Sequence, residues 1–172
     1  SKTPHFRWVN KPSNYPRKEA NVWYSASRFG INFNVDSAVV LGYPHPEFLP
    51  DEGAGSICDS NGKLLLYTDG KQIYSPGPGA CDQKLPNGNG LVGLSAKTTG
   101  AFVQKPGNPN IYYMLTTGQL DALRYTEIDL AMNGGYGDVV IGKKNLVLKA
   151  NPTWEAFAII DHCNRKDIWI VT

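Results

Sequence analysis

The chain has 172 residues, a length that suits one domain with a well-buried core. Its 18 glycines and 12 prolines disfavour helices, and its nine tyrosines, six phenylalanines and four tryptophans suit strands, so we expect an all-β protein. Seventeen basic residues balance 15 acidic ones to a net charge of +2 with no long basic run, which excludes a typical nucleic-acid-binding protein.

Residues 1–20 contain three prolines and are predicted to form an extended N-terminal arm or a strand that completes a neighbouring sheet. Residues 1–10 lack the apolar core of a signal peptide. No segment of the sequence approaches the ~20 apolar residues that a transmembrane helix needs. We assign the remaining residues, 21–172, to one all-β region.

Three segments of this region share one pattern: a short strand, a polar turn with glycine or asparagine, and an apolar strand ending in threonine. They span residues 56–68, 101–116 and 158–172. Their closing threonines, Thr68, Thr116 and Thr172, lie 48 and 56 residues apart, close to the ~40–50-residue repeat of β-propeller blades. Each segment is therefore predicted to be a β-hairpin in a blade of its own.

The apolar strands of these hairpins, residues 64–67, 111–115 and 168–171, are continuous rather than alternating in polarity. Such strands are typical of sheets buried on both faces, as in blades that stack broadside around an axis. Further elements fill the intervals between the hairpins. We expect strands at residues 21–25, 123–130, 139–141 and 145–148, a tight turn at 133–135, and loops at 43–50, 75–80 and 85–90.

The predicted fold is a partial β-propeller of about three blades, each a four-stranded antiparallel sheet, over residues 21–172. Closed propellers contain about four to eight blades. We therefore expect a fragment of a larger propeller, or a chain whose propeller is completed by other chains. A compact four-bladed ring that uses the N-terminal arm is the alternative.

The most reactive-looking stretch places His162 beside Cys163, with Asp161 and Asp167 on either side. When the three hairpins are aligned, residues 162–165 fall at the turn of the third hairpin. The corresponding turns of the first and second hairpins are residues 59–62 and 105–108. Those turns contain neither histidine nor cysteine, and a thiol nucleophile needs a base within hydrogen-bond reach. The stretch is interpreted as a turn, and no catalytic residue or metal ligand is predicted in the chain.

Two other polar stretches are also interpreted structurally. Asp59 is expected to accept a hydrogen bond from the backbone of its own turn. Asp69 is interpreted as a strand end, and a side chain that faces a ligand is the alternative. The glycine-rich residues 87–93 lack the lysine, the serine or threonine, and the following helix of a phosphate-binding loop, so we expect a surface loop there.

Binding residues are sought between the repeats, where propeller rims carry them. The candidates are Tyr43, His45, Trp154 and Glu155, which together suggest an aromatic platform for a sugar or a peptide. Packing between blades is the competing interpretation for Trp154.

The three cysteines, Cys58, Cys81 and Cys163, lack the spacing of a zinc site. We expect unreactive, half-buried thiols, with a disulfide between Cys58 and Cys81 as the alternative in an oxidising compartment.

A set of motifs in fixed order resembles the N-terminal β-propeller region of secreted and envelope proteins of Bacteroidetes that are associated with gliding motility or type IX secretion. The motifs are NVWY at 21–24, DSNGKLLLYTDG at 59–70, KPGNPNIYY at 105–113, NGGYGD at 133–138, and HCN at 162–164 followed by Asp167 and Trp169. The resemblance implies an exported protein, in the periplasm or at the cell surface, and carries no catalytic motif.

The expected function is that of a non-catalytic propeller module, without a cofactor, that binds a protein or a surface glycan in adhesion, gliding motility or secretion machinery. One alternative is a structural subunit of an envelope complex that partner chains complete. The other is a fragment of a carbohydrate-active enzyme whose catalytic residues lie outside the chain or on the rim.

Overall fold

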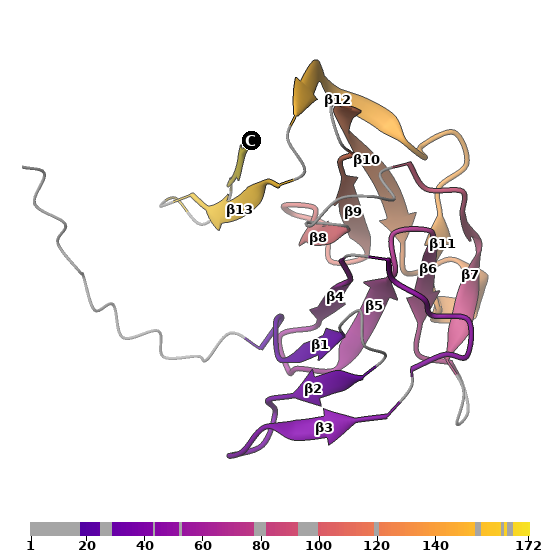
Figure 1. Cartoon of the computed structure of the whole chain (residues 1–172), viewed down its shortest axis with the longest axis vertical. Coiled ribbons are helices and arrows are strands. Elements are labelled where there is room, and N and C mark those ends of the chain that lie inside the picture. The colour runs from indigo at the N-terminus through magenta and orange to yellow at the C-terminus, as the bar shows by residue number, and fades with distance from the viewer. Residues whose placement is uncertain are drawn as a thin grey trace, which may run out of the picture.

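Antiparallel strands form almost all of the regular structure in the computed structural model (Figure 1). The structure describes residues 18–24, 29–42, 44–51, 53–77, 82–92, 100–118, 121–153, 156–162, 164 and 167–172. Within this part of the chain there are 14 strands and one short 3-10 turn. The prediction of an all-β fold is confirmed.

The strands form four sheets, which we call sheets A to D. Sheet A has the order β1 (Val22–Tyr24), β2 (Gly30–Asn32), β3 (Val39–Leu41). Sheet B has the order β4 (Gly55–Cys58), β5 (Leu64–Thr68), β6 (Gln72–Ser75), β7 (Gln83–Asn89). Sheet D is the hairpin of β13 (Ala158–Asp161) and β14 (Ile168–Val171).

Sheet C contains β8 (Ala101–Gln104), β9 (Ile111–Thr116), β10 (Asp121–Asp129), β11 (Asp138–Val139) and β12 (Leu146–Thr153). One edge of β10 pairs with β9, and its other edge is shared by β11 and β12. The turn between β10 and β11 is the 3-10 segment Asn133–Gly135, in which all three residues have positive φ. This confirms the turn predicted from its glycines.

The three predicted repeats are the hairpins β4–β5, β8–β9 and β13–β14, and each lies in a different sheet. All three turns are closed by the same type of backbone hydrogen bond. The amides of Asp59, Lys105 and His162 donate to the carbonyls of Lys63, Ile111 and Asp167 at 2.8, 2.8 and 2.9 Å. The alignment of the reactive-looking stretch with the two sister turns is therefore correct.

The sheets follow one another in chain order along an arc, from β1–β3 to β13–β14 (Figure 1). Three apolar clusters lie between successive sheets. The A–B cluster contains Phe48, Tyr67 and Tyr74, the B–C cluster includes Leu66 and Met114, and the C–D cluster includes Leu115 with Ile159 and Ile170. Sheets B and C are thus covered on both faces, because neighbouring residues of a strand point to opposite sides.

The continuous apolar runs differ in how far they are covered. β5 and β9 are buried or half-buried throughout, as predicted. β14 alternates between half-buried and exposed residues, and Trp169 is 57 % exposed, so the prediction of two buried faces is wrong for residues 168–171. The reason is that sheet D has a neighbouring sheet on one face only, among the residues that the structure describes.

The expected sheet sizes and one loop also need correction. Instead of about three four-stranded sheets, the described chain has sheets of three, four, five and two strands, and these strands form no closed ring. Residues 85–90, expected to be a loop, lie largely in β7. Pro86 is tolerated because β7 is the last strand of sheet B, where a missing amide donor breaks no ladder. The predicted arm falls mostly on residues 1–17, which lie outside the described residues.

Candidate functional site

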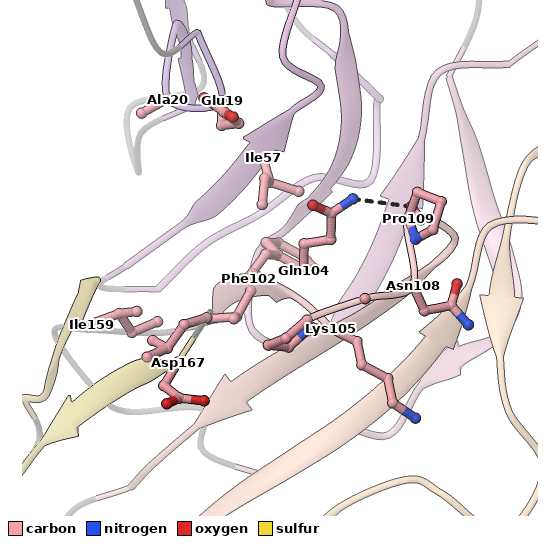
Figure 2. Close-up of a pocket in the computed structure, with 14 residues that line it drawn as sticks. Glu19, Ala20, Ile57, Phe102, Gln104, Lys105, Asn108, Pro109, Ile159 and Asp167 are labelled. Atoms are coloured by element: carbon pink, nitrogen blue, oxygen red, sulfur yellow. Dashed lines mark hydrogen bonds between the residues drawn. The ribbon is translucent and has the colours of Figure 1, made fainter. Parts of the chain in front are cut away.

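A pocket of about 1050 Å³ opens where the first strands of the three repeat hairpins approach one another (Figure 2). β4, β8 and β13 lie on the same side of the arc, and β7 lies on the opposite side (Figure 1). Each of the three has a sheet partner on one edge only within the described structure. The pocket lies beside the edges of these strands that have no sheet partner among the described residues, and the backbone of Glu19 bonds to the edge of β4.

The floor of the pocket is apolar and comes from three different sheets. Ile57 belongs to β4, Phe102 to β8 and Ile159 to β13 (Figure 2). Ile57 and Phe102 are 9 % and 8 % exposed, so their side chains are fixed by the B–C cluster. This gives the pocket a preformed, rigid apolar surface.

Glu19 supplies the most unusual polar atom of the pocket. Its carbonyl accepts a hydrogen bond from the amide of Cys58 at 2.8 Å, which holds the residue along the edge of β4. Its Oε2 atom is buried and has no hydrogen-bond partner among the described residues. A buried carboxylate oxygen without a donor is costly, and a ligand that brought a donor or a positive charge would remove that cost.

Two carboxylates, Glu19 and Asp59, act on the nearby Tyr112 hydroxyl. Burial raises the pKa of Tyr112, and the charges of Asp59 and Glu19 act in the same direction. Lys105 lines the pocket with its stem, but its ammonium points away from Glu19 (Figure 2) and lies 6.0 Å from the centre of the Tyr113 ring. Among the described residues, Glu19 forms no ion pair within 4 Å.

Gln104 sets the shape of the opposite wall. Its side-chain amide donates to the carbonyl of Pro109 at 3.2 Å (Figure 2). It also donates to the Tyr112 hydroxyl at 3.3 Å. These bonds hold the turn at residues 105–110 against β8. The wall is thereby ordered before any ligand arrives.

Of the four binding residues predicted from the sequence, His45 alone lies among the described residues, and it does not line this pocket. Tyr43, Trp154 and Glu155 lie outside the described residues. His45 packs its ring on Tyr74 at 5.1 Å, and its Nδ1 accepts a hydrogen bond from the amide of Glu47 at 3.1 Å. His45 therefore belongs to the packing between sheets A and B.

Glu19, Ile57, Phe102 and Ile159 were not predicted as site residues. The repeat could have indicated Ile57, Phe102 and Ile159, because these three residues lie on the first strands of the predicted hairpins. Their convergence on one pocket depends on how the sheets stack, which the repeat does not specify.

The stretch around His162 is a turn, as predicted. The Nδ1 atom of His162 accepts a hydrogen bond from the amide of Asn164 at 3.1 Å, and the ring lies 5.5 Å from that of Trp169. The amide of Asp167 donates to the Asn164 side chain at 3.0 Å. Cys163 lies outside the described residues.

The other polar residues considered as sites are structural as well. Asp59 accepts hydrogen bonds from the amides of Asn61 and Lys63 at 2.8 and 2.9 Å, which confirms the predicted turn. Cys58 is a free, buried thiol, and burial raises its pKa, which suppresses the reactive thiolate. Cys81, its alternative disulfide partner, lies outside the described residues.

Aromatic rings fill the space between sheets A and B. Tyr67 and Tyr74 stack with their centres 5.1 Å apart and their planes at 11°. Burial raises the pKa of both, and it raises the pKa of Tyr24, which packs on Tyr67, to about 12. Asp82 lies beside the Tyr67 hydroxyl, and burial also raises the pKa of its carboxyl, against the opposing effects of Tyr67 and His45.

Replacing Asp82 by asparagine should make the protein more stable at neutral pH. A carboxyl whose pKa is higher in the folded than in the unfolded chain favours folding below its unfolded pKa of about 3.9, and this stabilisation is lost as the pH rises through the folded value. The asparagine side chain cannot ionise, so the Asp82→Asn variant should melt above the wild type at pH 7 and converge with it in acid. Thermal melts from pH 3 to 8 measure this, and a variant that melts lower than the wild type at pH 7 contradicts it.

Across the described residues, no three or more histidine, cysteine, aspartate or glutamate side chains gather closely enough to hold a metal ion. Of the helical segments described, none has the length and apolar character required to span a bilayer.

These features define an all-β protein of antiparallel sheets stacked face to face, with a preformed pocket beside the edge strands β4, β8 and β13. Comparisons with protein-family models, with curated proteins and with solved structures find no match to this chain.

Proposed function

We propose that sheets A to D are successive blades of an incomplete β-propeller, and that the chain is a non-catalytic binding module of an exported protein. Three features support the propeller. The sheets stack in chain order, the junctions between them are apolar, and β4, β8 and β13 share one side of the arc. In a propeller, the first strands of the blades line the central channel, which would make the pocket part of that channel.

The ligand that fits this pocket best is a polypeptide segment that carries a basic side chain. The observation that carries this proposal is the buried, unpartnered Oε2 of Glu19 beside the apolar floor of Ile57, Phe102 and Ile159. An ammonium or guanidinium group would donate to Glu19, and the adjacent apolar atoms of the segment would cover the floor. A surface glycan fits less well, because Phe102, the only aromatic residue among the described residues that line the pocket, is 8 % exposed and offers no open ring face.

Selection of random peptides by phage display on the purified chain tests this proposal, with a glycan array run in parallel. We expect enriched peptides that contain lysine or arginine next to apolar residues. Glu19→Gln should weaken the best peptide about tenfold or more, because it removes one charge-assisted hydrogen bond.

The matched control is Glu47→Gln, which removes an exposed carboxylate that pairs with Lys84 away from the pocket. It should leave peptide affinity unchanged. Selection of acidic peptides, binding to glycans alone, or equal effects of the two variants would each argue against the proposed ligand.

Export to the periplasm or the cell surface is part of the same proposal and is supported by the resemblance of the ordered motifs. Fractionation of the native cells, followed by protease treatment of intact cells, tests it. Recovery of the protein only from the cytoplasm would contradict it.

A further inference from the structure

The outer face of sheet D is apolar and exposed. Ala158 lies opposite Val171, and Ile160 lies opposite Trp169, so these four side chains share one face of the hairpin. Ile160, Trp169 and Val171 are 53, 57 and 52 % exposed. The opposite face carries Ile159 and Ile170, which pack on sheet C.

The outer face of sheet A, at the other end of the stack, has the same character. Trp23 pairs with Ile31, which in turn pairs with Val40, so the three side chains point to the same side. Trp23 is 55 % and Val40 is 73 % exposed. Phe33 packs edge-on against Trp23 at 5.1 Å and extends the apolar surface. We call these two surfaces face A (Trp23, Ile31, Val40) and face D (Ala158, Ile160, Trp169, Val171).

The three junctions inside the chain show what kind of surface covers such a face. At each of them, the apolar face of one sheet meets the apolar face of the next sheet in chain order. Face D corresponds in position to the faces that meet the next sheet at the internal junctions. Face A corresponds in position to the faces that meet the previous sheet. Contact of face D with face A would therefore continue the established interface in the same direction, whereas contact between two D faces or two A faces would reverse it.

We propose that face D of one copy of this chain covers face A of a second copy. The residues that define the two faces are uncharged, with His162 beside Trp169 at 5.5 Å on sheet D. Each face centres on a tryptophan, a residue enriched at the energetic centre of protein interfaces. The contact is heterologous, so each copy retains one free face, and association continues until a ring closes. The residues of faces A and D do not line the pocket, although the indole of Trp23 donates a hydrogen bond to the carbonyl of Ala20, a pocket residue, at 2.6 Å. The inference does not depend on the ligand of the pocket.

Sedimentation velocity over a concentration series tests the self-association. We expect the wild type to pass from monomer to dimer or higher species as its concentration rises. Trp23→Lys destroys face A and leaves face D, whereas Trp169→Glu destroys face D and leaves face A, so each variant alone should stay monomeric. Ile141→Ser is the control, because Ile141 is 86 % exposed but belongs to neither face, and it should associate like the wild type.

The decisive measurement is the equimolar mixture of the two tryptophan variants. It contains one intact face D, on the Trp23→Lys chain, and one intact face A, on the Trp169→Glu chain, so it should form a 1:1 dimer that grows no further. Self-association of either variant alone would indicate contact between like faces and overturn the proposal. A monomeric mixture, or a wild type that is monomeric at all concentrations, would overturn it as well. Far-UV circular dichroism and melting temperatures establish that both variants are folded, and Trp23→Ser with Trp169→Ser replaces any variant that is not.

Discussion

Replacing Phe48 by alanine will lower the free energy of unfolding by about 3–5 kcal/mol. Phe48 is fully buried, and its ring centre lies 5.8 Å from that of Tyr24, 5.4 Å from that of Tyr67 and 5.9 Å from that of Tyr74. Phe48 lies in the loop between β3 and β4, and its side chain fills the space between sheets A and B. Its removal leaves a cavity that the three surrounding rings cannot collapse to fill. Urea denaturation measures the loss.

Phe29→Ala is the matched control for this substitution. Phe29 is 37 % exposed, so its truncation removes less buried surface and opens no enclosed cavity, and the loss should stay below about 1 kcal/mol. Similar losses for the two variants would mean that the ring cluster does not join the two sheets as described.

Replacing Asp69 by alanine will lower the free energy of unfolding by about 3 kcal/mol or more. Asp69 is 3 % exposed. Its Oδ1 accepts hydrogen bonds from the amides of Lys71 and Gln72, both at 2.9 Å. Its Oδ2 accepts from the amide of Leu49 at 3.2 Å and from the Tyr74 hydroxyl at 3.1 Å. Alanine leaves these donors without an acceptor, and buried donors without partners cost more than the bonds contribute when formed.

Asp51→Asn provides the comparison for Asp69→Ala. Asp51 forms a surface ion pair with Lys71 at 2.9 Å, with its side chain 57 % exposed, so its loss should change stability by less than about 1 kcal/mol. The loss of unfolding free energy for Asp69→Asn should lie between those of Asp69→Ala and Asp51→Asn. The asparagine amide keeps one acceptor oxygen, but it turns a donor toward the Leu49 amide and the Tyr74 hydroxyl. Chemical denaturation of all three variants ranks them, and any other order would contradict this account of Asp69.

Both predictions concern residues 44–50, which lie in the stretch 43–50 that the sequence indicated only as a loop. The ring of Phe48 and the carboxylate of Asp69 fix this loop onto sheet B by different means, one by burial and one by hydrogen bonding. For Asp69, the sequence indicates a strand end, with a ligand-facing side chain as the alternative. Its four hydrogen bonds within the chain show that it is structural.

The sequence by itself determined the hairpins and their turns. A polar turn between two apolar strands is specified by residues a few positions apart, which is why the three repeats, the turn at Asn133–Gly135 and the backbone bonds to Asp59 were all predicted. It also determined that the three hairpins lie in separate sheets, since a spacing of about fifty residues leaves room for other strands between them.

Only the tertiary structure decided which faces are covered and where the pocket lies. Residues 64–67, 111–115 and 168–171 look equally apolar, yet the third is exposed on one side, because burial depends on a neighbouring sheet and not on the strand itself. β7 forms despite Pro86 because it is an edge strand, and the order of strands in a sheet is a property of the fold. Glu19, Ile57, Phe102 and Ile159 meet for the same reason: they are far apart in sequence, and the stacking of the sheets brings them together.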